Sequence, residues 1–319
     1  MDYKESIDPE LRKGAKSYPF NRFYILTGNA YQKLEWRFTR IPESLQEDTI
    51  VTEGFQGLSM KTTVFSPAGA GDKLPALIYV HGGAFCYEAA AYQKKLACIY
   101  AERAECKVFF PHYHLSPKYQ YPAAYEDLLS LYRYVTAHTA ELGIDADRIG
   151  VAGDSAGATL AAMISHHCEE EKLPPPVFQM LVYPMTDADP DTASMKYFRD
   201  TPMWDASEMD RMWTYYCGND RERRYQAVPM RCELPRTIPK TYIEAAEFDC
   251  LHDEGLLYGE KLQSAGASVE INDTKGTYHG YDRTLDAEIV KRNVDRRISF
   301  IRSVEKTPAS TGGEMNRLN

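Results

Sequence analysis

Short apolar runs alternate with longer segments of mixed polarity along most of the chain. Uninterrupted apolar runs are typical of strands that are buried on both faces, whereas apolar spacings of three and four residues are typical of helices. These patterns predict strands at 76–80, 107–113, 148–152, 177–183, 241–245 and 268–272. They predict helices at 89–105, 122–139, 158–164, 254–265 and 285–304. Two alternating runs at 49–55 and 58–65, separated by Gln56-Gly57, add an antiparallel pair at one sheet edge.

This alternation of strands and helices predicts an α/β protein with a mostly parallel, doubly wound sheet of eight strands. The alternation is absent from residues 1–45, which are rich in aromatic residues and are predicted to be helical. It stops again at 187–232, an insertion rich in Asp, Met, Tyr and Trp that we interpret as a cap segment. The sheet and its helices would then occupy 46–186 and 233–304, followed by a disordered tail at 305–319.

Composition limits the classes of protein to which the chain can belong. The 319 residues are 44% hydrophobic and 26% charged, as expected for a globular protein with a sizeable core. The net charge of −9 argues against nucleic acid and anionic membranes as partners. No apolar segment predicts a signal peptide or a membrane helix. The seven cysteines include no C-x-x-C pair, which favours reduced thiols and a cytoplasmic location over a zinc or redox site.

The sequence Gly153-Asp154-Ser155-Ala156-Gly157 lies between a predicted strand and a predicted helix. In that setting the G-x-S-x-G pattern is typical of a nucleophile elbow, a tight turn that exposes the serine hydroxyl. The glycines allow the strand and the helix to approach closely, and the start of the helix favours developing negative charge. Ser155 is therefore the predicted nucleophile.

A serine hydroxyl needs a base within hydrogen-bonding distance, and on this type of fold the chain order is serine, acid, histidine. Two histidines follow the insertion, His252 and His279. His279 follows the last predicted strand in a glycine-flanked loop, so we predict it to be the base. His252 follows the preceding strand too closely and is expected to begin the next helix.

The acid must orient the imidazole and stabilise its charged form. Asp249 follows the penultimate predicted strand and is the best candidate. Asp253 and Glu254 come within the next turn, where the start of a helix favours carboxylates, so we expect structural roles for them. Glu247 is expected to contact the catalytic residues rather than the substrate.

An oxyanion needs backbone N–H donors. Gly82, Gly83 and Ala84 follow the strand at 76–80, where a loop of this kind would supply such donors. The predicted oxyanion hole consists of the Gly83, Ala84 and Ala156 amides, with Gly82 shaping the turn. His81 precedes the serine in the chain and is expected to fix this loop.

These motifs resemble those of the hormone-sensitive-lipase-like family of α/β-hydrolases, whose members are mainly carboxylesterases. The resemblance extends from about residue 45 to 302 and includes H-G-G at 81–83, G-D-S-A-G at 153–157, D-x-L at 249–251 and H-G at 279–280. It implies an α/β-hydrolase fold with a helical cap built from residues 1–45 and 187–232. Ala84 replaces the third glycine of the family's usual H-G-G-G, a change that a negative φ would accommodate.

Further residues are candidates for a substrate pocket, with core packing as an equal alternative for each. They are Phe85, Tyr87, Asp154, Tyr183, Met203, Trp204, Trp213, Leu251, Tyr278 and Tyr281. The acidic run at 187–191 lacks the glycine and the glutamate of a calcium loop and is interpreted as an acidic cap loop, so no metal site is predicted. His166, His167 and Cys168 are expected at the solvated end of the helix that follows the serine.

The chain is therefore predicted to be a serine carboxylesterase that hydrolyses short- to medium-chain esters through an acyl-enzyme, without metal or organic cofactor. An amide or formamide hydrolase or an acyltransferase would use the same residues. A non-catalytic ligand-binding α/β-hydrolase is the alternative from another class, although such proteins usually lack one of the three catalytic residues. The expected partner is a small-molecule ester, with no nucleic acid and no stable membrane association, and an exposed last strand would support a homodimer.

Overall fold

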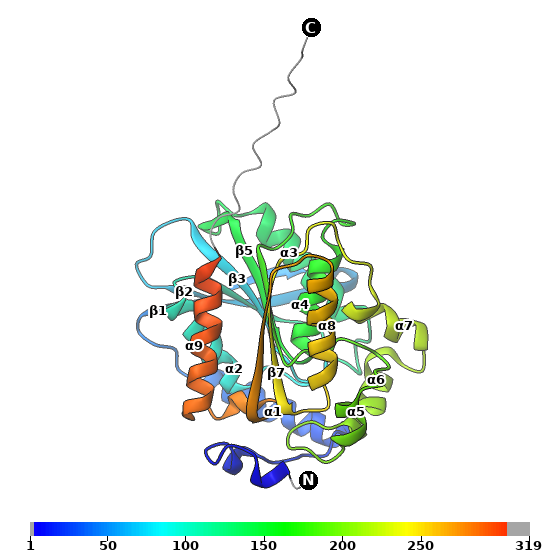
Figure 1. Ribbon diagram of the computed structural model, residues 1–319. Coiled ribbons are helices and arrows are strands. Elements are labelled where there is room, and N and C mark those ends of the chain that lie inside the picture. Colours follow the sequence, from blue (N-terminus) through cyan, green and yellow to red (C-terminus); the bar gives the residue numbers. More distant parts are fainter. Residues whose placement is uncertain (1–2, 305–319) are drawn as a thin grey trace.

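The computed structural model describes residues 3–304, and these residues contain one sheet of eight strands (Figure 1). Across the sheet the strands follow the order β1-β2-β4-β3-β5-β6-β7-β8. Their bounds are β1 Leu45–Glu53, β2 Ser59–Pro67, β3 Leu74–Val80, β4 Lys107–His112, β5 Ile144–Asp154, β6 Phe178–Val182, β7 Lys240–Phe248 and β8 Val269–Tyr278. β2 is antiparallel to both β1 and β4, and the other neighbours are parallel. The predicted α/β class and mostly parallel sheet are confirmed.

Helices cover both faces of this sheet (Figure 1). Their bounds are α2 Ala91–Arg103 and α9 Glu288–Ser303 on one face, and α3 Ala123–Ala137, α4 Ala156–His167 and α8 His252–Ser264 on the other. In β3, Ile78 packs in the core beneath α3 and α4, and Tyr79 packs in the core beneath α2 and α9. Successive strand residues therefore enter different cores, which explains why the strand is apolar throughout.

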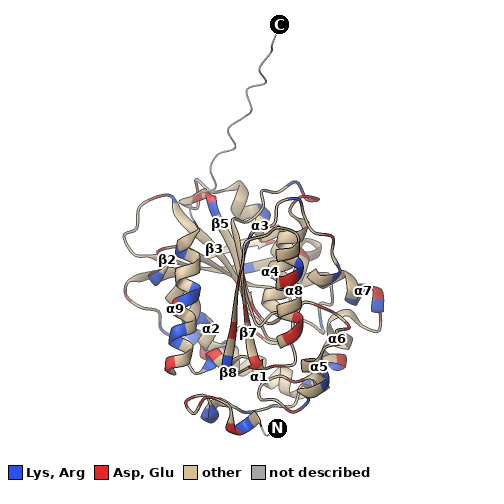
Figure 2. Cartoon of the chain, viewed as in Figure 1, with Lys and Arg blue, Asp and Glu red and all other residues tan. Residues whose placement is uncertain are grey.

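Charged residues lie mainly on the outer layers of the fold. Figure 2 shows them on the outer helices α7, α8 and α9, whereas β3 carries none. No helix within residues 3–304 is long and apolar enough to cross a bilayer.

The last strand is longer than its sequence predicts. β8 continues to Tyr278, whereas the apolar pattern ends near Asn272. Beyond that point β8 is polar and alternates between buried and exposed residues, and its pairing with β7 shifts between Ala246 and Phe248. An edge strand with one solvated face carries no continuous apolar run, so the sequence pattern stops before the strand does.

The two segments outside the alternation contain only helical elements within the described residues. They are η1 Tyr3–Glu5, η2 Arg12–Gly14 and α1 Arg22–Phe38, and then α5 Ala193–Tyr197, η4 Ala206–Glu208, α6 Met209–Cys217, α7 Arg221–Gln226 and η5 Pro229–Arg231. The segments touch, because the Met203 amide donates to the Lys16 carbonyl at 3.0 Å and the rings of Phe20 and Trp204 are 5.2 Å apart. Their assignment to one cap stays a prediction, and the predicted tail at 305–319 lies outside the described residues.

Candidate active site

Ser155 occupies a sharp turn between β5 and α4. Its φ of 54° and ψ of −124° are unusual for a residue with a side chain and are typical of a nucleophile elbow. A Cβ on Gly153 would lie 2.3 Å from the Gly157 carbonyl carbon, and one on Gly157 would lie 2.1 Å from the Val80 carbonyl oxygen. Both glycines are therefore required for the strand and the helix to approach this closely.

Three predicted residues meet at the carboxyl ends of β5, β7 and β8. The Ser155 hydroxyl donates to Nε2 of His279 at 2.9 Å, and Nδ1 of His279 donates to Oδ2 of Asp249 at 2.6 Å. Asp249 is fully buried, and its Oδ1 accepts the Leu251 amide at 3.0 Å. The carboxylate fixes the imidazole tautomer that leaves Nε2 free to accept the serine proton, which is the arrangement of a Ser-His-Asp triad.

The alternative residues lie elsewhere. His252 begins α8 and contacts Asp253 and Asp273, as expected for a histidine at the start of a helix. The Glu254 carboxylate is buried and accepts the Thr186 amide at 2.6 Å, and burial raises its pKa well above the ordinary value.

Glu247 supports the base from the neighbouring strand. Its carboxylate accepts the Gly276 amide at 2.7 Å and so ties the end of β7 to the segment that leads to His279.

The loop after β3 has an unusual backbone. Gly83 has a φ of 116°, Ala84 a φ of 52° and Phe85 a φ of 58°. The expectation of a negative φ at Ala84 is therefore wrong. The Cys86 and Tyr87 amides both donate to the Gly83 carbonyl and close a turn whose two central residues, Ala84 and Phe85, are both left-handed. Ala84 tolerates the conformation at a cost of about 1–2 kcal/mol.

His81 and Asp154 support this loop. His81 is buried, its Nδ1 lies 2.7 Å from the Gly82 carbonyl oxygen, and its ring stacks on Tyr113 at 4.4 Å. Burial lowers the pKa of His81 to about 3, so the ring is neutral. Asp154 accepts hydrogen bonds from Tyr79 and Gln93, and burial raises its pKa to about 6.

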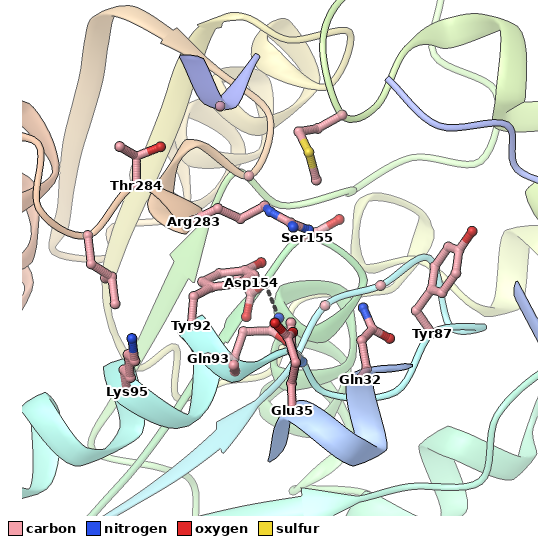
Figure 3. Close-up of a pocket in the computed structure, with 18 of the residues that line it drawn as sticks. Gln32, Glu35, Tyr87, Tyr92, Gln93, Lys95, Asp154, Ser155, Arg283 and Thr284 are labelled. Carbon is pink, nitrogen blue, oxygen red and sulfur yellow. Dashed lines mark hydrogen bonds between the residues drawn. The ribbon is translucent and has the colours of Figure 1, made fainter. Parts of the chain in front are cut away.

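A cavity of about 1700 Å³ opens at Ser155 and His279 (Figure 3). The predicted residues that line it are Gly82, Gly83, Ala84, Tyr87, Asp154, Tyr183, Met203 and Trp204. Ala156 is buried at the start of α4, directly after Ser155. The volume exceeds the roughly 300–1,000 Å³ of ordinary small-molecule sites, so the cavity has room for more than a small ester.

Other predicted pocket residues do not line this cavity. Phe85 stacks on Tyr216 with ring centroids 3.7 Å apart, and Leu251 is buried just before α8. The Tyr278 hydroxyl donates to the Leu11 carbonyl at 3.2 Å. Trp213 and Tyr281 are buried as well and are also absent from the lining. These side chains pack in the core instead. Aromatic and apolar residues occur both in cores and in substrate pockets, so the sequence alone does not distinguish the two positions.

The residues predicted from the sequence did not include one wall of the cavity. Residues of α1, of α2 and of the segment after His279 that line it are Tyr24, Thr27, Tyr31, Gln32, Glu35, Tyr92, Gln93, Lys95, Arg283 and Thr284. A partial signal is the abundance of aromatic residues in 1–45, because Tyr24 and Tyr31 of this segment line the cavity.

Two weaker expectations concern the acidic loop at 187–191 and the end of the helix that follows Ser155. Asp187 pairs with Arg231 at 2.7 Å, so this acidic loop is held by basic side chains, and no cluster suited to a metal occurs within residues 3–304. The solvated position predicted for His166 and Cys168 is wrong. Both are buried, and His166 hydrogen-bonds to the Glu233 carbonyl and the Tyr258 hydroxyl, because the segment after η5 covers this end of α4.

Comparison with known proteins agrees with this fold. The family model described as alpha/beta hydrolase fold matches residues 77–283, and the chain belongs to this family. Esterase LipI of Mycobacterium tuberculosis is 32% identical over 289 residues, which cover 88% of this chain and 89% of LipI. Carboxylesterase NlhH of the same organism is 31% identical over 286 residues, covering 87% and 89%.

Among solved structures, a bacterial heroin esterase superposes with a TM-score of 0.86 at 28% identity, covering 93% of this chain and 98% of that one. The predicted α/β-hydrolase fold and the resemblance to the hormone-sensitive-lipase-like family are confirmed. The chain is a hydrolase of the esterase group within this family.

Proposed function

We propose that this protein is a serine carboxylesterase that hydrolyses short- to medium-chain esters, with Ser155 as nucleophile, His279 as base and Asp249 as the orienting acid. The observation that carries the proposal is the unbroken set of hydrogen bonds from Ser155 through His279 to Asp249 at the cavity. Esterase and carboxylesterase relatives at 31–32% identity support the same reaction class.

Each residue has a defined step in this reaction. The Ser155 oxygen attacks the ester carbonyl carbon while Nε2 of His279 takes the hydroxyl proton. The tetrahedral intermediate collapses, the alcohol leaves with the proton from His279, and an acyl-serine remains. Water, deprotonated by His279, then attacks the acyl-serine and releases the acid. Asp249 stabilises the imidazolium in both halves without taking its proton.

The oxyanion would be held by the amides of Gly83, Ala84 and Ala156. Gly83 and Ala84 lie in the tight turn after β3 and line the cavity together with Ser155. The Ala156 amide is the first of α4, where the unpaired N–H groups and the helix dipole favour negative charge. Backbone donors of this kind contribute by being fixed before the charge develops.

Aromatic side chains of the two helical segments support the proposed preference for short and medium acyl chains. Phe20 contacts the rings of Tyr87, Trp204 and Tyr215, so aromatic side chains from both helical segments meet beside the cavity. Rigid aromatic walls suit short and medium acyl groups.

Hydrolysis of a nitrophenyl ester series from acetyl to long acyl chains tests the proposal. Wild type is expected to show turnover that is highest for short acyl groups, and Ser155→Ala is expected to lose about 10⁴-fold or more. Ser165→Ala is a matched control, because Ser165 lies on the same helix and its hydroxyl bonds only to the Ala161 carbonyl among the described residues. Absence of turnover on every ester, or full activity in Ser155→Ala, would refute the proposal.

The same triad would serve an amide hydrolase or an acyltransferase, and parallel assays with nitroanilides and added alcohols separate these reactions. A non-catalytic binding protein would show no turnover in any of them. A homodimer and a cytoplasmic location stay predictions, and size-exclusion chromatography with light scattering tests the first.

A further inference from the structure

The cavity wall opposite the aromatic cap residues is polar and basic. Tyr92 and Lys95 of α2 form part of it, and Arg283 and Thr284 contribute from the other side (Figure 3). Nothing in the hydrolysis of a plain short ester requires charged groups at this position, so this wall needs an explanation of its own.

Arg283 is fixed close to the reacting groups. It is the last residue of the 3-10 helix η6 (Tyr281–Arg283), which begins two residues after His279. Its neighbour Asp282 is fully buried and accepts hydrogen bonds from Arg297 at 3.1 Å and from the Tyr183 hydroxyl at 3.0 Å. The Tyr183 ring lies 4.9 Å from that of His279. The backbone that carries Arg283 is therefore anchored beside the predicted base.

The Arg283 side chain is exposed and extends into the cavity. Its guanidinium carbon lies 6.0 Å from the centre of the Tyr92 ring, and Figure 3 shows it reaching over Tyr92 in the direction of Ser155. Arg283 and Ser155 line the same cavity. A molecule bound to this guanidinium would therefore occupy the same cavity as the nucleophile.

Arg283 and Lys95 take part in no ion pair with any residue between 3 and 304, although the chain carries a net charge of −9. Three acidic residues of the lining are already engaged: Glu35 accepts the Tyr31 hydroxyl, Glu88 pairs with Lys33, and Glu102 accepts the Ser44 hydroxyl.

The remaining acidic residues of the lining form no ion pair with Arg283 within residues 3–304 either. Glu10 accepts the Glu288 amide, Asp205 accepts the Ser207 amide, and Glu208 pairs with Arg211. Asp154 is satisfied by Tyr79 and Gln93, and no ion pair joins Asp286 to Arg283. In an acidic protein, unpaired cations beside a nucleophile indicate that the anion comes from outside the chain.

We propose that Arg283 binds a carboxylate carried by the ester substrate, so that the enzyme prefers half-esters and other ester acids over neutral esters of the same length. The inference rests on the proposed esterase function and specifies its substrate class. The planar guanidinium matches a carboxylate through two parallel N–H···O bonds, and such charge-assisted bonds are stronger than neutral ones. The Lys95 ammonium, which lines the same wall, adds positive potential.

The carboxylate can belong to the acyl part or to the alcohol part of the ester, and two substrate pairs distinguish these. Mono-4-nitrophenyl glutarate against 4-nitrophenyl valerate places the charge on the acyl chain. 4-Acetoxybenzoate against its methyl ester places the charge on the leaving group. Within each pair the reacting carbonyl and the chain length are matched.

The readout is the ratio of kcat/KM for the charged ester to that for its neutral partner. In wild type this ratio is expected to exceed one for at least one pair and to fall as NaCl is raised from 50 to 500 mM, because added salt screens the charge. Arg283→Gln is expected to lower the ratio roughly 10- to 100-fold by raising KM for the charged ester. Arg283→Lys is expected to lower it less, because lysine keeps the positive charge but lacks the two parallel N–H donors of the guanidinium. Arg302→Gln removes an arginine that pairs with Glu105 outside the cavity and is expected to leave the ratio unchanged.

The outcomes separate the two proposals. If wild type hydrolyses neither member of either pair, the esterase proposal fails. If it hydrolyses the neutral esters but the ratio is below one or insensitive to salt, the carboxylate subsite is refuted and the esterase proposal stands. If Arg283→Gln does not fold, Arg283→Lys and the salt dependence of wild type decide the question. A ratio that is the same in wild type and Arg283→Gln also overturns the inference.

Discussion

Replacing Arg297 with methionine is expected to destabilise the fold by about 3–5 kcal/mol. Arg297 lies on α9 and is fully buried, together with its partners Glu244 on β7 and Asp282 in η6. Its guanidinium donates to both carboxylates and to the hydroxyls of Tyr100 and Tyr281. Methionine replaces much of the side-chain volume but none of these bonds.

The expected loss of stability comes mainly from the two buried carboxylates that the substitution leaves without Arg297. Two carboxylates with 0% exposure would lose the one cation that pairs with them within residues 3–304, and a buried charge without a partner is costly. Burial alone raises the pKa of Glu244, but the charge and hydrogen bonds of Arg297 outweigh it and hold the pKa below the ordinary value. Burial raises the pKa of Asp282, and Arg297 offsets only part of that rise.

The cost is expected to depend on pH. Without Arg297 both carboxyl groups would have folded-state pKa values above those of the unfolded chain. The unfolded state then loses its protons at lower pH than the folded state, so stability falls as pH rises through this interval. The deficit of Arg297→Met relative to wild type is therefore expected to be smaller near pH 4.5 than at pH 8.

Urea denaturation followed by circular dichroism at several pH values measures this free energy. Arg302→Met is the control, since its pair with Glu105 is exposed at the surface and is expected to contribute less than about 1 kcal/mol. A loss below about 1 kcal/mol in Arg297→Met, or a deficit that does not change with pH, would refute the reasoning.

Three further predictions concern single groups. Ala84→Gly is expected to raise the free energy of unfolding by about 0.5–1 kcal/mol in urea titrations, because glycine adopts a φ of 52° without strain; a loss of stability would contradict this. Burial raises the pKa of Asp154 from 3.8 to about 6, so the stability of wild type relative to Asp154→Asn is expected to fall by about 3 kcal/mol from pH 3 to pH 7 and to stay level above pH 7, and a flat difference would argue against this pKa. Cys232 is half-buried whereas the other six cysteines are buried, so Ellman's reagent is expected to label Cys232 first in the native protein, and a Cys232→Ser variant that reacts equally fast would disprove it.

The sequence predicted those features whose physical cause is local. β3 is apolar on both faces because each face meets a helical layer, and that requirement is visible in five consecutive residues. The turn at Ser155 needs glycines on both sides at fixed spacing, which the five residues from Gly153 to Gly157 supply. The order of Ser155, Asp249 and His279 sufficed to name the three residues that hydrogen bonds connect, because parallel strands end at one edge of the sheet.

Only the tertiary structure decided the features that depend on distant partners. Phe85 packs on Tyr216 rather than lining the cavity, and an aromatic residue in a loop carries no local sign of that choice. Arg297 lies on a helix predicted from its apolar spacing, yet its burial depends on Glu244, which is 53 positions earlier. The basic wall around Arg283 likewise forms only when α2 and η6 meet. Periodicity and spacing report how a segment folds, whereas the partner of each side chain is set by contacts that the folded chain alone creates.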